Sequence, residues 1–223
     1  IVFYDPLAPN SQFDLSGLCE WPNVALAPVR ASPFSLRQQI ALPTLARQQR
    51  LSLYHSPYYL FPYALRCPTV VSLHDLIPLL YPESARRYGR QLFALAAELA
   101  TRRAEHIIVD SEATRRMVME RWRMPSERIS AIPLAADDCF GGADSAAVDR
   151  MRKKLGLDGP YVLHVGTNKP HKNLARLVEA WAGDPDLFGA FNLAIVGGNL
   201  EHPTVEEQGV LRAPGDVVLR APW

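Results

Sequence analysis

Several features that would assign a function class directly are scarce in this chain. Its 223 residues carry 24 lysines and arginines against 23 aspartates and glutamates. The resulting formal net charge of +1 gives no strong electrostatic attraction for a nucleic acid. No apolar run reaches the ~20 residues that a membrane-spanning helix needs, and no signal peptide is visible. These absences predict a soluble, cytoplasmic protein that binds no nucleic acid.

Cysteine is scarce as well. The three cysteines, Cys19, Cys67 and Cys139, are far apart and form no CxxC pair, so their spacing predicts neither a disulfide framework nor a zinc site. Each is expected to be a small, buried, apolar residue. The fingerprints of two large nucleotide-binding classes are absent too: the GxGxxG of dehydrogenases and the GxxxxGK(S/T) of P-loop enzymes.

What the chain does contain is an alternation of short apolar runs with stretches of helical periodicity. This pattern predicts an α/β fold with parallel sheets. The expected strands are residues 1–4, 24–29, 51–54, 69–73, 107–109, 129–133, 161–165, 193–196 and 217–219. The expected helices are one that Ser35 caps and Pro43 interrupts, 84–104, one from Ser111 to Pro125, 148–155, and 172–182.

The chain is expected to form two domains. It is 48% hydrophobic, which is enough for one or two cores. Gly141-Gly142 and the small residues after them indicate a boundary, so we expect domains at 1–140 and 141–223. In the helix at 84–104, Leu92, Leu95 and Leu99 follow helical spacing and are expected on its apolar face.

The stretch from Tyr161 to Asn173 is the most informative in the chain. An apolar run at 161–165, as expected of a strand buried in a parallel sheet, leads into Gly166, which permits a sharp turn. A helix with an apolar face follows Pro170. A helix N-terminus presents free backbone N–H groups and the positive end of its dipole, and Lys169 and Lys172 add positive charge. The stretch indicates a phosphate site. The alternative is an ordinary glycine turn with solvated lysines.

Histidines follow two of the expected strands. His55 comes after strand 51–54 and His74 after strand 69–73. Ligands of open α/β sheets bind beyond the carboxyl ends of the strands, so His74 is a candidate binding residue, although a lone histidine is more often structural. The aromatic loop at 56–63, which contains Tyr58, is either a loop that packs onto the domain or a platform for stacking sugars.

Four segments, in this order, resemble those of retaining glycosyltransferases of family 4, in particular the mannosyltransferase-like group. They are VSLHDLIPLLYPE at 71–83, IIVDSEATRR at 107–116, the hinge-like IPLAADDCF at 132–140, and 161–173 with 193–198. The resemblance implies the GT-B fold, in which two Rossmann-like parallel-sheet domains face a cleft. The chain starts without methionine and lacks the family's glycine-rich first loop and its Glu-x7-Glu motif. We therefore expect a fragment with an incomplete second domain.

The resemblance also implies an activity and a set of site residues. Such an enzyme moves a hexose, with mannose as the first candidate, from a nucleotide-diphosphate sugar to a glycan or lipid-linked saccharide. The implied catalytic residues are His74, near the transferred sugar as an acceptor of its hydroxyl hydrogen bonds, and Lys172, whose charge replaces a metal ion. The implied donor-binding residues are Gly166, Thr167, His171, Lys172, Asn173, Gly197 and Gly198. The acceptor-side candidates are His55, Tyr58 and Asp75. No cofactor and no metal are expected, and a lipid-linked acceptor would add peripheral association with the inner face of the membrane.

Some residues depart from the family pattern. Thr167 and His171 stand where many members have arginine, which weakens the neutralisation of the donor's charge. Glu112 and Glu120 have the Glu-x7-Glu spacing, but they lie on an amphipathic helix of the first domain, so we interpret the match as coincidence. A module that binds a nucleotide sugar or a sugar without turnover is the alternative function.

The carboxylates that follow the strands offer no convincing nucleophile for a covalent intermediate. Asp110 has no motif neighbour, and Asp75 is expected to cap its own loop. A double displacement would need such a nucleophile. We therefore expect front-face displacement with retention, in which a departing phosphate oxygen takes the acceptor's proton.

Overall fold

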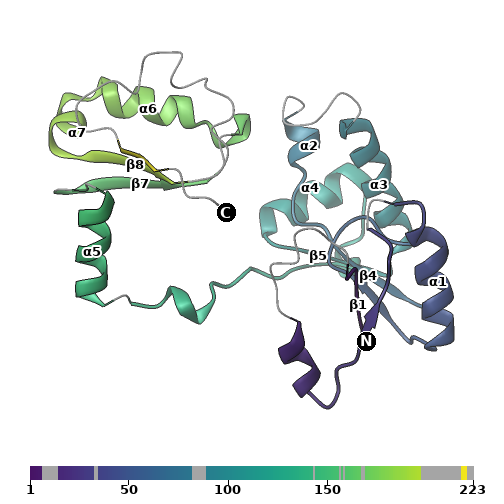
Figure 1. The fold of residues 1–223 in the computed structure, drawn as a ribbon. Helices are drawn as coiled ribbons and strands as arrows, with labels where there is room; N and C mark the ends of the chain where they lie inside the picture. The colour runs from purple at the N-terminus through teal and green to yellow at the C-terminus, as the bar shows by residue number, and fades with distance from the viewer. Residues whose placement is uncertain are drawn as a thin grey trace. The chain divides into compact units, whose positions relative to one another are not determined.

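The computed structural model describes residues 1–6, 15–32, 35–81, 89–142, 144–155, 157, 159–166, 169–196 and 217–219. The chain divides into two compact units. The first comprises Ile1–Leu80 and Arg87–Leu134, and the second Tyr81–Arg86 and Ala135–Trp223. Within the described residues every strand pairing is parallel (Figure 1), which confirms the predicted α/β class.

The first unit contains two sheets. Strands β1 (Val2–Tyr4) and β2 (Leu26–Pro28) form a two-stranded sheet. A four-stranded sheet has the order β3 (Tyr54–Ser56), β4 (Thr69–Ser72), β5 (His106–Val109), β6 (Ile129–Ala131). The α-helices are α1 (Gln38–Gln48), α2 (Ile77–Leu80), α3 (Gly89–Arg103) and α4 (Glu112–Trp122). Each predicted strand of this unit is present, with bounds that shift by up to three residues.

Helices α3 and α4 cover the same face of the four-stranded sheet. Right-handed crossovers between parallel strands in sequential order place successive helices on one side. This face carries Val71, Ile107 and Val109, which are fully buried against Phe93 of α3 and Val118 of α4. The core of the unit therefore lies between these helices and the sheet.

The other face of this sheet carries polar side chains among Val70 and Ile108. His55 Nε2 lies 3.0 Å from Ser72 Oγ, and His106 Nε2 lies 2.9 Å from Ser130 Oγ. His55 is the central residue of β3, so its expected position after the end of a strand is wrong. The strand begins at Tyr54 because this is where pairing with β4 begins, three residues beyond the start of the apolar run.

Helix α3 buries a different face from the predicted one. Leu92 and Leu95 are 66% and 57% exposed, whereas Phe93, Ala97 and Ala100 are buried. The buried set has the same helical spacing as the leucines. Alanine permits a closer approach of the helix to the sheet, so packing selects this face despite its smaller side chains.

Helix α1 also differs from its prediction. It continues through Pro43. An internal proline removes one backbone hydrogen bond of the helix, and packing of the buried residues Leu42 and Ala46 stabilises the turns around it. Ser35 donates to the Ser32 carbonyl oxygen rather than capping the helix, and Leu36 and Ile40 are exposed. The buried face is Gln38, Leu42 and Ala46.

Helix α4 starts as predicted. Ser111 Oγ accepts a hydrogen bond from the Thr114 backbone N–H at 3.1 Å, an N-cap contact. The helix ends at Trp122 rather than at Pro125, because Arg123 adopts the left-handed conformation with φ of 49°. The Met124 N–H then closes the helix on the Met119 carbonyl oxygen, as in a Schellman motif.

This left-handed arginine leads to a stability prediction. Glycine is the usual residue at such a position, so Arg123→Gly is expected to raise the free energy of unfolding by roughly 0.5–1 kcal/mol, as left-handed strain is relieved. The matched control, Arg121→Gly, lies inside α4 and should lower it by about 1 kcal/mol. Urea unfolding of both variants tests the pair. A loss of stability in Arg123→Gly equal to that of the control would contradict the prediction.

The second unit has a three-stranded sheet in the order β7 (Tyr161–Val165), β8 (Asn192–Val196), β9 (Val217–Leu219). Its helices are α5 (Ser145–Leu155), α6 (Leu174–Gly183) and α7 (Pro185–Ala190), and the 3-10 turn η5 covers Pro170–Lys172. α6 packs Leu174, Val178 and Trp181 onto β8, which confirms its predicted apolar face. α7 was not predicted from the sequence, although its Asp184 cap and Pro185 are common start signals.

Two burial predictions are wrong. Strand β7 was expected to be buried, but Leu163 and Val165 are exposed, because α6 covers only the sheet face that carries Val162. Cys19 is exposed and Cys67 is partly buried. Cys19 lies in the 3-10 helix η1 (Ser16–Glu20), away from the core of the first unit. No helix in the described residues combines the length and apolarity needed to cross a membrane.

Candidate functional site

Three adjacent strand ends of the first unit bring polar groups together. Pro57 follows β3, His74 comes two residues after β4, and Asp110 follows β5. Because the strands are parallel, these residues lie at the same edge of the sheet. His74 Nδ1 lies 2.9 and 3.1 Å from the two carboxylate oxygens of Asp110, and His74 Nε2 lies 2.9 Å from the Pro57 carbonyl oxygen.

These contacts define the proton state of His74. Both ring nitrogens face oxygen atoms that only accept hydrogen bonds, so both must carry a proton. The side chain is therefore an imidazolium that donates from both nitrogens. The sequence analysis expected His74 to accept hydrogen bonds from sugar hydroxyls, and in this arrangement both ring nitrogens are already engaged.

The electrostatic surroundings of His74 support this assignment. Burial lowers its pKa, but the hydrogen bonds to Asp110 and to the Pro57 carbonyl, together with the charges of Asp110 and Asp75, raise it above the ordinary 6.5. The contribution of the pairing to stability is thus fully present below pH 6.5, and it is lost as the pH rises through the raised folded-state pKa. The side chains of His74 and Asp110 are 44% and 24% exposed, so a ligand can reach them.

The aromatic loop after β3 is held in place, which positions the Pro57 carbonyl. The buried Ser56 hydroxyl lies 2.7 and 3.2 Å from the carbonyl oxygens of Tyr58 and Leu60. Gln39 of α1 donates to the Phe61 carbonyl oxygen and accepts from the Tyr63 N–H. Local contacts thus leave the loop little freedom beside His74.

Most of the loop's aromatic groups serve packing. Phe61 is almost fully buried, and the Tyr59 ring lies edge-on to Phe93 with a centroid separation of 4.7 Å. Burial raises the pKa of Tyr59, and contacts with Tyr58 and the charge of Asp75 add to this effect. These contacts favour the interpretation as a loop that packs onto the domain. Tyr58 remains partly exposed, with its ring 4.1 Å from that of Tyr59.

The two carboxylates near His74 have different positions. The Ile77 backbone N–H donates to Asp75 Oδ1 at 2.9 Å, which confirms that Asp75 caps its own loop. Asp110 was set aside in the sequence analysis, yet it makes the ion pair with His74. A usable signal existed: both residues follow the ends of consecutive strands, and such strands are often neighbours in a parallel sheet.

The turn at residues 166–173 of the second unit, which was predicted to bind the sugar donor and is called the donor turn below, is described only in part. Thr167, Gly197 and Gly198 lie outside the described residues. The Gly166 N–H donates to the Val196 carbonyl oxygen at 2.8 Å. This amide is therefore not free for a phosphate, because the β7–β8 pairing extends one residue further than predicted.

The residues after the turn retain the features of an anion site. Lys172 is exposed and lies in η5, and α6 begins at Leu174, two residues later than predicted. Between them Asn173 has a left-handed backbone with φ of 52°, and its side chain makes no cap hydrogen bond. His171 is partly exposed in the same turn. Within the described chain, the first N–H groups of α6 thus have no side-chain cap to compete with an anion.

His164 in β7 is a further residue that the sequence analysis did not identify. Its Nε2 is buried, and among the described residues it has no hydrogen-bond partner. A Cβ atom built on Gly166 would lie 3.4 Å from this nitrogen, so the ring lies beside the start of the donor turn. Searched over the described residues, no group of three or more histidines, cysteines, aspartates or glutamates could hold a metal ion.

The fold is that of the GT-B glycosyltransferases. Anabaena Alr3699/HepE, solved in complex with UDP-glucose, is 18% identical, with 93% of this chain and 58% of that chain covered and a TM-score of 0.62. Sucrose-phosphate synthase from Thermosynechococcus elongatus is 18% identical, with 98% and 58% covered and a TM-score of 0.67. A glycosyltransferase from Rickettsia africae is 10% identical, with 95% and 59% covered and a TM-score of 0.61.

The chain belongs to Glycosyltransferase Family 4. The sequence model of this family matches residues 4–138, more than half of the chain and most of the first unit. No curated protein sequence matches the chain. The chain spans less than two thirds of the length of the similar solved structures.

Proposed function

We propose that the protein is a retaining glycosyltransferase that moves a hexose, with mannose as the first candidate, from a nucleotide-diphosphate sugar to a hydroxyl of a glycan or lipid-linked saccharide. The observation that carries this proposal is His74, held as an imidazolium by Asp110 and Pro57 at the carboxyl edge of a sheet. It lies in the part of the chain that matches Glycosyltransferase Family 4. A lipid-linked acceptor would bring the protein to the inner face of the membrane.

The two units contribute different groups to the reaction. The uncapped start of α6 and the Lys172 ammonium bind the diphosphate, which gains charge as it leaves. His74 donates a hydrogen bond to the sugar that is transferred, in place of its contact with the Pro57 carbonyl. No step of this scheme requires a metal ion, since positive charge is available from lysine.

The stereochemical part of the proposal has its own test. Asp75 is engaged as a cap, and Asp110 is engaged with His74, so neither is free to attack the anomeric carbon. We therefore expect front-face displacement. Proton NMR of the product should show the donor's anomeric configuration, and Asp75→Asn, which keeps the capping oxygen, should retain substantial activity. An inverted product or a covalent sugar on Asp75 would overturn this mechanism.

Asp110→Asn provides a prediction about the ion pair. Loss of the carboxylate charge lowers the His74 pKa, so the active imidazolium is lost at a lower pH. At high pH we expect transfer to fall roughly tenfold for each unit by which the pKa drops, and much less at pH values below the ordinary 6.5. The pH profile of kcat measures the shift. Asp75→Asn is the matched control, because the Asp75 charge contributes least to the raised His74 pKa and its loss should move the profile less. An unshifted profile in Asp110→Asn would contradict the role of the pair.

The overall function is tested on the full-length protein. A thermal-shift screen of nucleotide sugars identifies the donor, because a ligand that binds the folded state raises the melting temperature. Release of nucleotide diphosphate with an acceptor mixture then measures turnover. Binding without turnover under any acceptor would favour the non-catalytic module, and no binding of any nucleotide sugar would contradict both functions.

A further inference from the structure

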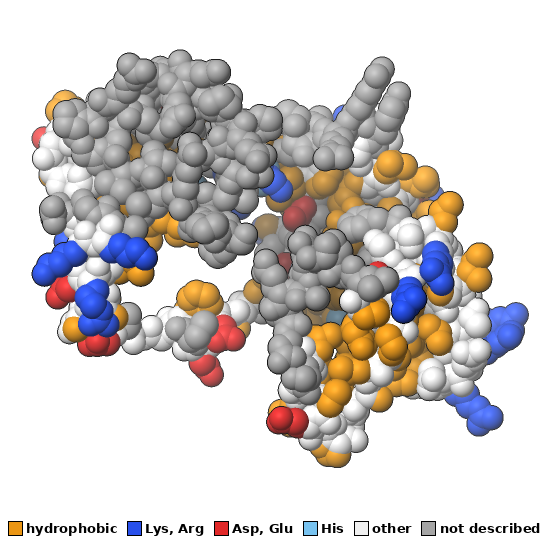
Figure 2. All heavy atoms as spheres, viewed as in Figure 1, with side chains coloured by type: hydrophobic (Ala, Val, Ile, Leu, Met, Phe, Trp, Pro, Cys, Tyr) orange, Lys and Arg blue, Asp and Glu red, His pale blue; other side chains and the backbone are white. Residues whose placement is uncertain are grey.

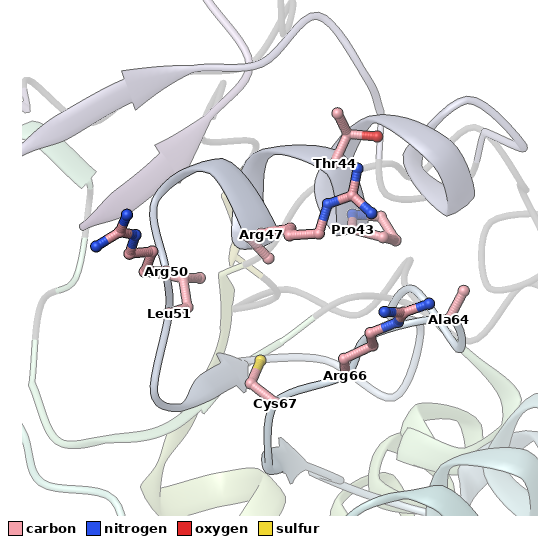
Figure 3. Close-up of a pocket in the computed structure, with 9 residues that line it drawn as sticks. Pro43, Thr44, Arg47, Arg50, Leu51, Ala64, Arg66 and Cys67 are labelled. Atoms are coloured by element: carbon pink, nitrogen blue, oxygen red, sulfur yellow. The ribbon is translucent and has the colours of Figure 1, made fainter.

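A cavity in the first unit lies away from His74. It has a volume of about 530 Å³ and lies between the second half of α1 and the segments that precede β3 and β4 (Figure 3). Its lining includes Leu51, before β3, and Cys67, before β4. Residues before parallel strands lie at the amino edge of the sheet, whereas His74 lies at the carboxyl edge. The cavity is therefore separate from the candidate catalytic site.

The charge of this cavity is uncompensated. Arg47, Arg50 and Arg66 line it, and among the described residues no carboxylate does. Within the same part of the chain, none of the three guanidinium groups makes a hydrogen bond or an ion pair. Other arginines of this unit do: Arg115 donates to the Ile129 and Ser126 carbonyl oxygens.

The side chains are arranged around a common space. Figure 3 shows Arg47 extending from α1 and Arg66 extending from the segment before β4 into the region between these elements, while Arg50 points away. Arg50 has a left-handed backbone with φ of 52°, and it follows α1 at a position where glycine is usual. Like charges that face one space repel each other, and an anion between them lowers this repulsion.

A smaller cavity of about 420 Å³ in the same unit contains arginines that are paired within the protein. It is also rich in arginine, but Glu98 in its lining forms an ion pair with Arg102. Arg128 in the same lining donates to the carbonyl oxygen of Thr101 at 3.2 Å. Two of its arginines are thus paired within the protein itself.

We propose that the cavity lined by Arg47, Arg50 and Arg66 binds a small molecule that carries a phosphate monoester or a diphosphate. The planar guanidinium fork matches phosphate oxygens in pairs. A group with at least two negative charges compensates Arg47 and Arg66, which face the common space (Figure 3), better than a single carboxylate does. The volume lies within the range of roughly 300–1,000 Å³ that is usual for small-molecule sites.

Cys67 offers a reporter inside the cavity, and the exposed Cys19 offers an internal control. The full-length protein is alkylated with anionic iodoacetate or neutral iodoacetamide at equal ionic strength, and each cysteine is followed by peptide mass spectrometry. A cationic cavity concentrates the anionic reagent, so the iodoacetate to iodoacetamide rate ratio should be about three- to tenfold higher at Cys67 than at Cys19. Millimolar pyrophosphate should slow alkylation of Cys67 and leave Cys19 unchanged.

Arginine variants test whether the alkylation rate ratio at Cys67 depends on Arg47 and Arg66. Arg47→Ala/Arg66→Ala should reduce the Cys67 ratio to that of Cys19 and abolish protection by pyrophosphate. Arg116→Ala, an exposed arginine of α4 that does not line the cavity, should change neither. Arg50→Gly relieves left-handed strain and is expected to fold well, so a partial loss of the ratio in this variant cannot be attributed to unfolding.

Separate protection experiments distinguish two kinds of phosphate ligand, a free small molecule and a lipid headgroup. Protection by pyrophosphate or inorganic phosphate supports a free ligand, and protection by phosphatidic acid vesicles but not phosphatidylcholine vesicles supports a lipid headgroup. Both results support the phosphate site. Equal rate ratios at Cys67 and Cys19, or protection by sodium chloride as effective as that by pyrophosphate, would overturn it.

Discussion

Replacing His74 with alanine is expected to lower kcat for sugar transfer by about a hundredfold or more, a loss typical of one preorganised charged donor. Affinity for the nucleotide diphosphate should stay nearly unchanged. The reason is the proposed division of contacts: we propose that the phosphates bind at the start of α6 in the second unit, whereas His74 belongs to the first. Steady-state kinetics and calorimetry of nucleotide diphosphate binding separate the two effects.

The matched control for His74 is His106→Ala. His106 also belongs to the four-stranded sheet and also bonds a neighbouring side chain, Ser130, but it lies on the sheet face rather than at the carboxyl edge. This variant should keep most of the activity. Equal losses of nucleotide affinity and turnover in His74→Ala would contradict the division of contacts, and equal losses of turnover in both histidine variants would indicate a structural role for His74.

Replacing Lys172 with alanine is expected to cost ~2–4 kcal/mol of transition-state stabilisation. Lys172 is exposed in η5, directly before the uncapped start of α6, so its ammonium group can reach the same anion as the backbone N–H groups. The charge on the diphosphate rises as the bond to the sugar breaks, so kcat should fall more than nucleotide affinity. The measurement is kcat/KM of the full-length enzyme with its preferred donor.

Two variants test whether the charge of Lys172 acts locally. Lys172→Arg keeps the charge and should recover part of the activity. Lys154→Ala removes an exposed lysine from α5 and should be neutral (Figure 2 shows lysine and arginine side chains on this part of the surface). Unchanged turnover in Lys172→Ala would exclude the residue from the site, and a similar loss in Lys154→Ala would indicate a general effect of net charge.

Much of this protein was determined by local sequence. The α/β class, the parallel strands and the apolar face of α6 followed from short periodic patterns, because each element has to bury one face. The caps formed by Ser111 and Asp75 were also predictable, since each involves a backbone N–H two or three residues away. The family was identified from segments whose order and spacing are properties of the sequence itself.

Other features were decided only by the tertiary structure. The ion pair of His74 with Asp110 joins residues 36 positions apart, and it depends on which strands are neighbours in the sheet. The buried face of α3 depended on how closely the helix approaches the sheet, and the Gly166 amide was taken up by one further pairing with β8. The arginine-lined cavity arises where α1 ends beside the segment before β4. Each of these depends on contacts between residues distant in sequence, which sheet register and side-chain packing fix and local periodicity does not encode.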